Sequence, residues 1–300
     1  MKTVTPTLLL IVSFFAGSVT LAQENRLYSQ YTSNMLAINP AYAGNQYQFN
    51  VTAVNRAQWT GIKGAPLTQT LTTHFRESES NHGVGLLVYH DKIGIHNNTQ
   101  VFGSYSYIIK ARHFNIAMGL QGGFEMMRSN YNDLTLNDAI DAKLNGNIRV
   151  VKPNFGGGIF IDNGKGYVGF SIPTLLEHSN LAPGAAQTPR HYILAVCKVW
   201  ELSRSVVFKP SALVRYQRGT PLNGEINTTF IFNSVVFAGV SYRTSKSLVA
   251  NLQLQLNTNF RFGYAFDYAF NSLSPYGTGS HELMLNYRIN LVEGPCHTYY

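Results

Sequence analysis

Apolar and polar residues alternate one by one along segment after segment of this chain, which is the spacing of β-strands. In residues 281–291, for example, Leu283, Leu285 and Tyr287 fall on one face, and polar residues fall between them. Residues 246–256 show the same period. The polar faces of the last strands carry four charged side chains, Arg261, Asp267, Glu282 and Arg288. The chain is therefore predicted to be all-β, with one apolar and one polar face on its sheet.

Strand length separates the two architectures that produce this alternation. Strands of soluble sandwiches usually have about 5–6 residues, whereas strands that span a bilayer need about 9–11. Residues 99–110, 113–124 and 205–216 alternate over that longer distance. Charged residues make up only 13% of the chain, against about 25% in soluble proteins. We therefore predict a transmembrane antiparallel β-barrel, with apolar residues facing lipid and polar residues facing the lumen.

The alternation predicts about fourteen strands, separated by connections that are longer and shorter in turn. The predicted strands are 47–56, 68–76, 82–90, 99–110, 113–124, 153–161, 165–172, 190–201, 205–216, 222–232, 234–242, 246–256, 259–269 and 281–291. The longer connections are 57–67, 91–98, 125–152, 173–189, 217–221, 243–245 and 270–280. This pattern predicts short periplasmic turns, longer extracellular loops and both termini in the periplasm. Within 125–152, residues 133–144 have the spacing of a short helix.

The N-terminal residues 1–22 have the features of a cleaved signal peptide. Lys2 is followed by a short apolar run and by small residues, which places the cleavage site between Ala22 and Gln23. The alternative, a transmembrane anchor, needs a longer apolar run than this one. The predicted organisation is a signal peptide at 1–22, an N-terminal periplasmic or plug segment at 23–46, a barrel at 47–291 and a tail at 292–300. Export makes nucleic acid an improbable partner despite the net charge of +8.

The sequence offers little for catalysis. IDNGKG, at 161–166, resembles part of a phosphate loop, but two predicted strands flank it and Asn-Gly is a hairpin turn pair. The nine histidines show no zinc-binding spacing with cysteine or glutamate. His90-Asp91 could belong to a hydrolytic triad, but no G-x-S-x-G motif accompanies it. We predict no enzyme activity, no cofactor and no metal site. A disulfide between Cys197 and Cys296 is possible in an oxidising compartment.

Three loop-like motifs stand out near the start of the chain. They are INPAYAGN at 38–45, RAQWTGIKGAPLTQT at 56–70 and HDKIGIHNNTQ at 90–100. Each combines turn-forming residues with a large side chain or a proline. In the first, Asn39-Pro40 favours an extended-to-turn conformation. Two interpretations are open: ordered loops that cap a barrel, or a surface that binds a partner or plugs the lumen.

Taken together and in this order, the three motifs resemble the PorP/SprF family, the outer-membrane components of the type IX secretion and gliding machinery of Bacteroidetes. The resemblance extends from about Gln30 to the last strand. The residues that match the family pattern are Asn39, Pro40, Ala41, Tyr42, Ala43, Gly44, Arg56, Gln58, Trp59, Gly61, Gly64, Ala65, Pro66, Thr68, Gln69, Asp91, Lys92, Ile93 and Gly94.

The resemblance implies a non-enzymatic outer-membrane barrel that helps to export a secreted protein or to anchor it at the surface, through that protein's C-terminal domain. It also implies partners within the secretion machinery: periplasmic ring components, a peptidoglycan-binding protein and the translocon. An alternative is a FadL-like channel for small molecules, because fatty-acid transporter barrels also combine fourteen strands with an N-terminal hatch.

Position predicts a role for the first motif. Because 38–45 lies between the signal peptide and the first strand, it should start on the periplasmic side and enter the lumen as a plug. The lumen residues Arg261, Asp267, Glu282 and Arg288 would then bind its backbone carbonyl and amide groups.

Overall fold

The computed structural model describes residues 28–131, 147–177, 190–270 and 277–289. Within them, three short 3₁₀ helices precede a series of strands: η1 Tyr31–Ser33, η2 Met35–Ala37 and η3 Pro40–Tyr42. The strands are β1 Phe49–Ala57, β2 Leu67–Phe75, β3 His82–Ile93, β4 His96–Lys110, β5 Asn115–Asn130, β6 Asn147–Asp162, β7 Gly166–Ile172, β8 His191–Lys198, β9 Trp200–Glu201, β10 Val206–Gln217, β11 Asn223–Phe232, β12 Val236–Arg243, β13 Ser247–Gln255, β14 Phe260–Ala269 and β15 Ser280–Ile289.

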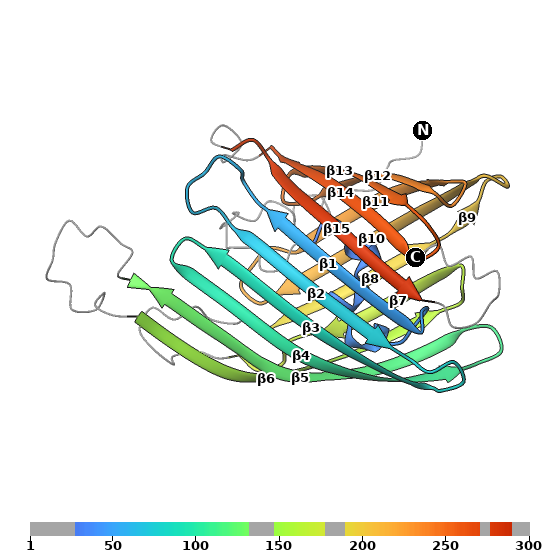
Figure 1. The fold of residues 1–300 in the computed structure, drawn as a ribbon, viewed down its shortest axis with the longest axis horizontal. Helices are drawn as coiled ribbons and strands as arrows, with labels where there is room; N and C mark the ends of the chain where they lie inside the picture. Colours follow the sequence, from blue (N-terminus) through green and yellow to red (C-terminus); the bar gives the residue numbers. More distant parts are fainter. Residues whose placement is uncertain (1–27, 132–146, 178–189, 271–276, 290–300) are drawn as a thin grey trace, which may run out of the picture.

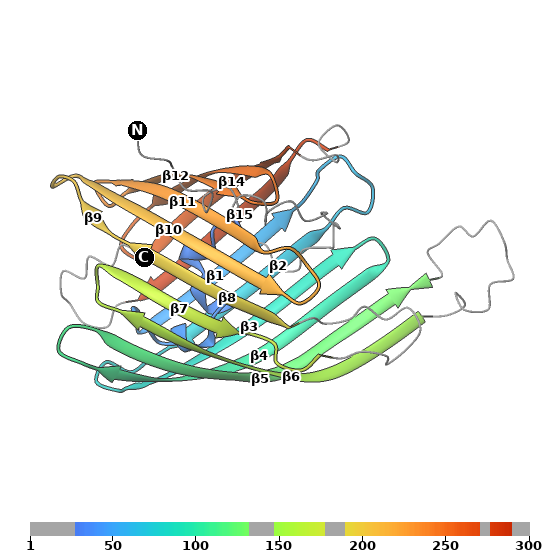
Figure 2. The same ribbon diagram turned by 180° about the vertical axis from the view of Figure 1, so that it is seen from behind.

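The strands close into a barrel in which every neighbouring pair is antiparallel. β1 pairs with β2 on one side and with β15 on the other, so the first and last strands seal the sheet (Figure 1). On the opposite wall, β10 pairs with β11 and also with β8 and β9 (Figure 2). β8 and β9 form one span that is interrupted at Val199. Over the described residues the result is a closed barrel of fourteen strands, as the sequence predicts.

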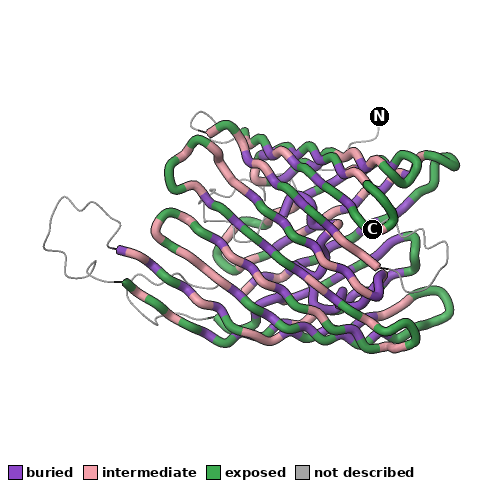
Figure 3. Tube along the Cα trace, viewed as in Figure 1, coloured by how far each residue is buried: buried purple, intermediate pink, exposed green. Residues whose placement is uncertain are grey.

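Burial alternates along each strand because successive side chains point to opposite faces of the sheet (Figure 3). The outer face is apolar, with exposed side chains that include Leu71, Val101, Leu120, Phe155, Val168, Leu252 and Leu285. The inner face is mostly polar and buried, and includes Thr72, Ser106, Gln121, Asn154, Ser171, Asn227 and Asn286. This is the reverse of a soluble sandwich and is typical of a barrel surrounded by lipid. In the described part of the chain, no helix combines the length and the apolar content needed to cross a membrane.

The two ends of the barrel differ in their connections. We call the end where β1 begins the turn end and the end where β1 finishes the loop end. β1, β5, β7 and β14 all finish at the loop end, and the chain positions between each of them and the next strand are the most numerous in the barrel. One sequence prediction was wrong there. The predicted loop 91–98 is a two-residue turn, because β3 continues to Ile93 and β4 begins at His96.

The connection predicted at 125–152 is also shorter than expected, because β5 continues to Asn130 and β6 begins at Asn147. The helix predicted at 133–144 lies outside the described residues.

Residues 28–48, which we call the inner segment, lie inside the barrel (Figure 1). Ser29 contacts the β15 residue Glu282, near the loop end, and Gln48 accepts a hydrogen bond from Arg76, next to β2 at the turn end. The inner segment therefore runs along the lumen before the chain turns into β1. Its apolar side chains form a core against the barrel wall, and they include Tyr31, Met35, Leu36, Ile38 and Ala41.

Candidate functional site

Asn39, the second residue of the first motif, binds both its own helix and the barrel wall. Asn39 caps η3: its Oδ1 accepts a hydrogen bond from the amide of Ala41 at 3.0 Å, and Pro40 occupies the first helical position. The Nδ2 group of Asn39 donates to the carbonyl oxygens of Ile159 on β6 and Phe170 on β7, at 3.1 and 3.4 Å. One side chain therefore caps the start of the helix and attaches it to two strands.

The next residues of the motif are small because the backbone of the inner segment lies against the wall. Ala41 and Ala43 are both fully buried. A Cβ atom built on Gly119 of β5 would lie 2.3 Å from the amide nitrogen of Ala41, and one built on Gly83 of β3 would lie 2.1 Å from the carbonyl oxygen of Ala43. Ser106 of β4 donates a hydrogen bond to that same oxygen. The alanines of the inner segment therefore lie against glycines of the wall, where a larger side chain would overlap the segment.

Tyr42 and Gly44 complete the contact at the turn end. The Tyr42 ring packs edge-on against His74 and Phe160, with ring centroids 5.6 and 5.3 Å apart. The amide of Gly44 donates to Nδ1 of His74 at 3.2 Å. Gly44 has φ of +67°, which favours glycine, and this conformation turns the chain toward β1.

Changing Gly119 to alanine is expected to push the first motif off the wall. The new methyl group would overlap Ala41, and overpacking of a tight contact typically costs about 1–3 kcal/mol. We expect a protease to cut the folded variant within residues 28–48 under conditions in which the parent chain stays intact. Gly103→Ala is the matched control, because a Cβ there meets only the Gly122 carbonyl oxygen, at 3.9 Å. Equal cleavage of both variants would contradict the contact.

A buried group of five charged side chains, which we call the charged cluster, lies nearer the loop end. Arg56 Nη2 lies 2.9 Å from Asp267 Oδ2, and Arg56 Nη1 lies 3.3 Å from Glu282 Oε2. Arg243 Nε lies 2.7 Å from Glu225 Oε2, and Arg243 also pairs with Asp267. The side chains come from β1, β11, β12, β14 and β15, so the cluster joins strands on both sides of the β1–β15 seam.

The charged cluster also binds the start of the inner segment. The Glu282 carboxylate accepts hydrogen bonds from the amides of Ser29 at 2.8 Å and Gln30 at 2.9 Å. Arg56 and Arg243 both donate to the Ser29 hydroxyl, and Arg243 also donates to the carbonyl oxygen of Tyr28 at 3.4 Å. Charge-assisted bonds of this kind are stronger than neutral ones. The cluster therefore fixes the inner segment as well as the strands.

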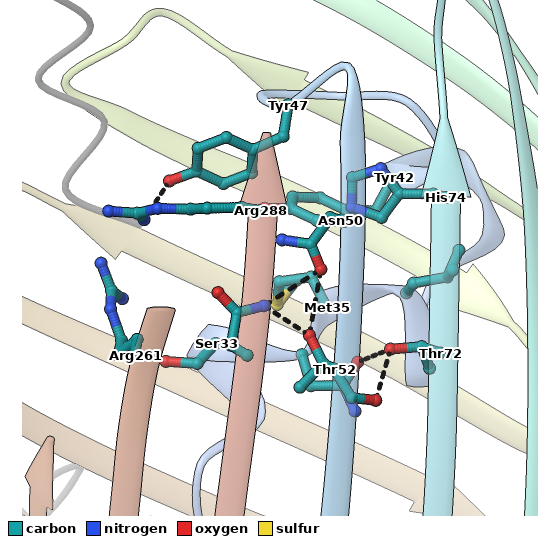
Figure 4. A pocket seen from close by; sticks show the side chains of 13 residues that line it. Ser33, Met35, Tyr42, Tyr47, Asn50, Thr52, Thr72, His74, Arg261 and Arg288 are labelled. Carbon is teal, nitrogen blue, oxygen red and sulfur yellow. Dashed lines mark hydrogen bonds between the residues drawn. The ribbon is translucent and has the colours of Figure 1, made fainter. Parts of the chain in front are cut away.

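Arg261 and Arg288 lie at the turn end, away from the charged cluster. Arg288 donates to the hydroxyl of Tyr47 at 2.6 Å, and both arginines donate to Oε1 of Gln255 at 2.9 Å. The Arg261 guanidinium lies over the Phe237 ring, 4.1 Å from its centroid. The two arginines border a cavity between the inner segment and β1, β2, β14 and β15 (Figure 4).

The second and third motifs meet at the loop end. The amide of Gly94 donates to the carbonyl oxygen of Gly64 at 2.9 Å, and Thr68 donates to the Asp91 carboxylate at 2.6 Å. Gly61, Gly64 and Gly94 all have positive φ angles, which explains glycine at these turns.

The β1–β2 loop is also tied to the loop that precedes β15. The amide of Trp59 donates to the Ser280 hydroxyl at 3.2 Å, and the amide of Gln58 closes the loop by donating to the carbonyl oxygen of Pro66 at 2.9 Å. Motif residues thus divide between the lumen and the loop end. Among the described residues, no group of three His, Cys, Asp or Glu side chains is placed to hold a metal ion.

The sequence profile described as "Type IX secretion system membrane protein PorP/SprF" matches residues 20–287, which is most of the chain. The chain belongs to the PorP/SprF family. It is therefore an outer-membrane barrel of the type IX secretion system, and PorP/SprF is not a known enzyme family. A search of curated proteins found no match.

Solved barrels resemble this PorP/SprF protein in fold. The CymD monoaromatic hydrocarbon channel has a TM-score of 0.54 at 11% identity and covers 88% of this chain and 94% of its own. The TodX monoaromatic hydrocarbon channel deltaS2 mutant has a TM-score of 0.50 at 11% identity, covering 87% and 95%. The Acinetobacter baumannii protein Omp33 has a TM-score of 0.49 at 10% identity, covering 82% and 100%. At such low sequence identities, the similarity to CymD and TodX concerns the fold alone.

The PorP/SprF barrel contains functional contacts that the sequence analysis missed. Arg243, which pairs with two carboxylates of the charged cluster, was not singled out, although its inward position follows from the alternation with Ser241 in β12. The wall glycines Gly83 and Gly119 also lie outside the three motifs. Their signal is weak, because an isolated glycine in a strand indicates close backbone approach without naming the approaching segment.

Proposed function

We propose that this PorP/SprF barrel helps to export a secreted protein, or to anchor it at the cell surface, by binding that protein's C-terminal domain. The observation that carries the proposal is the family match over residues 20–287. In this proposal the protein is non-enzymatic, belongs to the secretion and gliding machinery of a Bacteroidetes bacterium, and reaches the outer membrane by a cleaved signal peptide at 1–22.

The loop end is the surface that we assign to the secreted partner. The β1–β2 loop is held on two sides, by Gly94 and by the hydrogen bonds between Thr60 and residues 278–279. A loop that is already ordered loses little conformational entropy on binding. Trp59 is the second residue of this loop and is only half-buried. Tryptophan is enriched among the residues that dominate binding energy at protein interfaces.

The turn end would face the periplasm, because outer-membrane barrels have their short turns there. Periplasmic ring components, the peptidoglycan-binding protein and the translocon are proposed to contact the barrel from that side or within the membrane. The apolar outer wall contacts outer-membrane lipid. Nucleic acid is not proposed as a partner.

The alternative is a FadL-like channel for small molecules, because the CymD and TodX barrels of similar fold are monoaromatic hydrocarbon channels. Two observations favour the secretion role. The inner segment fills the lumen between the charged cluster and the turn end, and the described lumen wall is mostly polar, whereas a path for hydrophobic molecules needs apolar lining. The family match also concerns secretion.

An affinity capture of the tagged barrel from gently solubilised outer membranes tests the proposal. We expect to recover one large secreted protein, and to lose it when its C-terminal domain is deleted. Trp59→Ala should weaken the complex by about 30-fold, because truncation of a tryptophan that dominates an interface costs about 2 kcal/mol or more. Trp200→Ala is the matched control, because Trp200 is the other tryptophan and lies exposed on β9 at the turn end.

Recovery of the secreted protein with both variants alike would place its binding elsewhere on the barrel. Recovery of no secreted protein and no secretion component would contradict the proposal and favour the channel.

A further inference from the structure

The outer wall of the barrel carries three positively charged side chains close together near the loop end. Lys92 of β3 lies opposite Asn97 of β4, which in turn lies opposite Arg128 of β5. Arg128 lies opposite Arg149 of β6. Directly opposite residues of an antiparallel sheet share one face, and all three cations are exposed. β3 to β6 lie side by side (Figure 1), and we call Lys92, Arg128 and Arg149 the cationic row.

No ion pair in the described part of the chain involves the cationic row. The acidic residues of these four strands all point into the lumen, where they are buried: Asp91, Glu125 and Asp162. The two arginines meanwhile face each other across β5 and β6. Like charges directly opposite each other destabilise a sheet. A negatively charged ligand from outside the chain would remove this repulsion.

The cationic row begins where the apolar outer face ends. Met126 and Val151, the next outward-facing pair toward the turn end, are apolar, and Val151 is 54% exposed. Two residues advance a strand by about 6–7 Å, and each head-group layer of a bilayer is roughly 5–8 Å thick. The guanidinium groups of Arg128 and Arg149 therefore lie at the level of the lipid head groups.

The opposite wall of the barrel ends differently. At the loop end, the outward side chains of β8, β10, β12 and β14 are tyrosines, namely Tyr192, Tyr216, Tyr242 and Tyr268. Tyrosines at this position are typical of the aromatic girdle of membrane barrels. One side of the barrel thus presents aromatic rings to the head groups, whereas the side formed by β3 to β6 presents cations.

We propose that the cationic row binds the phosphate group of an outer-leaflet lipid, whose acyl chains lie on the apolar wall next to it. Guanidinium groups match the geometry of phosphate and bind it through paired hydrogen bonds. Arg128 and Arg149 belong to neighbouring strands and contact the same phosphate. Lys92 is two strand spacings, roughly 10 Å, from Arg128, and its long side chain adds charge from that side. The site is independent of the secreted partner proposed above.

Native mass spectrometry of the full chain in a neutral detergent tests the site at constant ionic strength. The probes are dioctanoyl phosphatidic acid and dioctanoylglycerol, which have the same acyl chains and differ in the phosphate. We expect the parent chain to bind the phosphate lipid about tenfold more tightly or better, because hydrogen bonds between charged groups are strong. Arg128→Gln should remove most of this preference. Arg218→Gln, which makes the same charge change at an exposed residue near Tyr216, should keep it.

Equal binding of the two lipids by the parent chain would overturn the proposal. An equal loss of preference in Arg218→Gln would also overturn it, because the attraction would then come from the overall charge. Displacement of the lipid by inorganic phosphate at the same concentration would assign the cationic row to free phosphate instead of a lipid.

Thermal unfolding in detergent without added lipid provides a second measurement. Because Arg128 and Arg149 repel each other, Arg128→Gln should melt at or above the temperature of the parent chain. A lower melting temperature would reveal a negative partner for Arg128 within the chain, and the proposed lipid site would then be wrong.

Discussion

Deletion of residues 24–45 is expected to turn a barrel of low conductance into an open pore. The inner segment packs against β3 to β7 through the first motif and against the charged cluster through Ser29 and Gln30. A barrel of fourteen strands is wider than the eight-stranded barrels whose side chains fill the interior, so removal of the segment should leave an aqueous path. We expect single-channel conductance in planar bilayers to rise by about tenfold or more.

The control for this experiment is deletion of the tail at 292–300, which leaves the inner segment intact. Folding of both variants is checked by their heat-modifiable migration on gels. Unchanged conductance in a folded barrel that lacks 24–45 would mean that the segment does not block the lumen.

The sequence predicts the barrel well because lipid imposes a strict rule on every strand. A side chain on the outer face must be apolar wherever the strand lies in the bilayer, so Leu283 and Leu285 reveal the face of β15 directly. That rule weakens where a strand extends beyond the lipid. Asp91, Lys92 and His96 show no apolar alternation, although they belong to the β3–β4 hairpin. The hairpin was therefore predicted as a loop.

The contacts inside the lumen were less predictable because they join residues far apart in the sequence. Alternation places Arg56 and Asp267 on inward faces, but it does not say that β1 closes against β15 and brings them together. The first motif shows the same limit. Its small residues indicate a close approach, but they do not identify Gly83 or Gly119 as the surfaces approached.

Arg243→Met is expected to be the most destabilising single change in the lumen. Arg243 is 1% exposed and pairs with Glu225 and Asp267. Its loss leaves Glu225 without its guanidinium partner and removes hydrogen bonds to Tyr28 and Ser29. Removing one partner of a buried ion pair typically costs about 3–5 kcal/mol, because the remaining charge stays buried without compensation. Urea unfolding in lipid vesicles measures the change.

Two comparisons separate this explanation from a general effect of losing an arginine. Arg204→Met, at an exposed turn residue, should cost less than about 0.5 kcal/mol. The double variant Arg243→Met with Glu225→Gln should recover part of the stability, because it removes the carboxylate that the single change leaves unpaired. Two outcomes would show that the Glu225–Arg243 pair does not stabilise the barrel. In one, Arg243→Met is no less stable than Arg204→Met. In the other, the double variant is less stable than Arg243→Met alone. Recovery in the double variant would instead assign the loss to the unpaired Glu225 charge, since Arg56 still neutralises Asp267 at 2.9 Å.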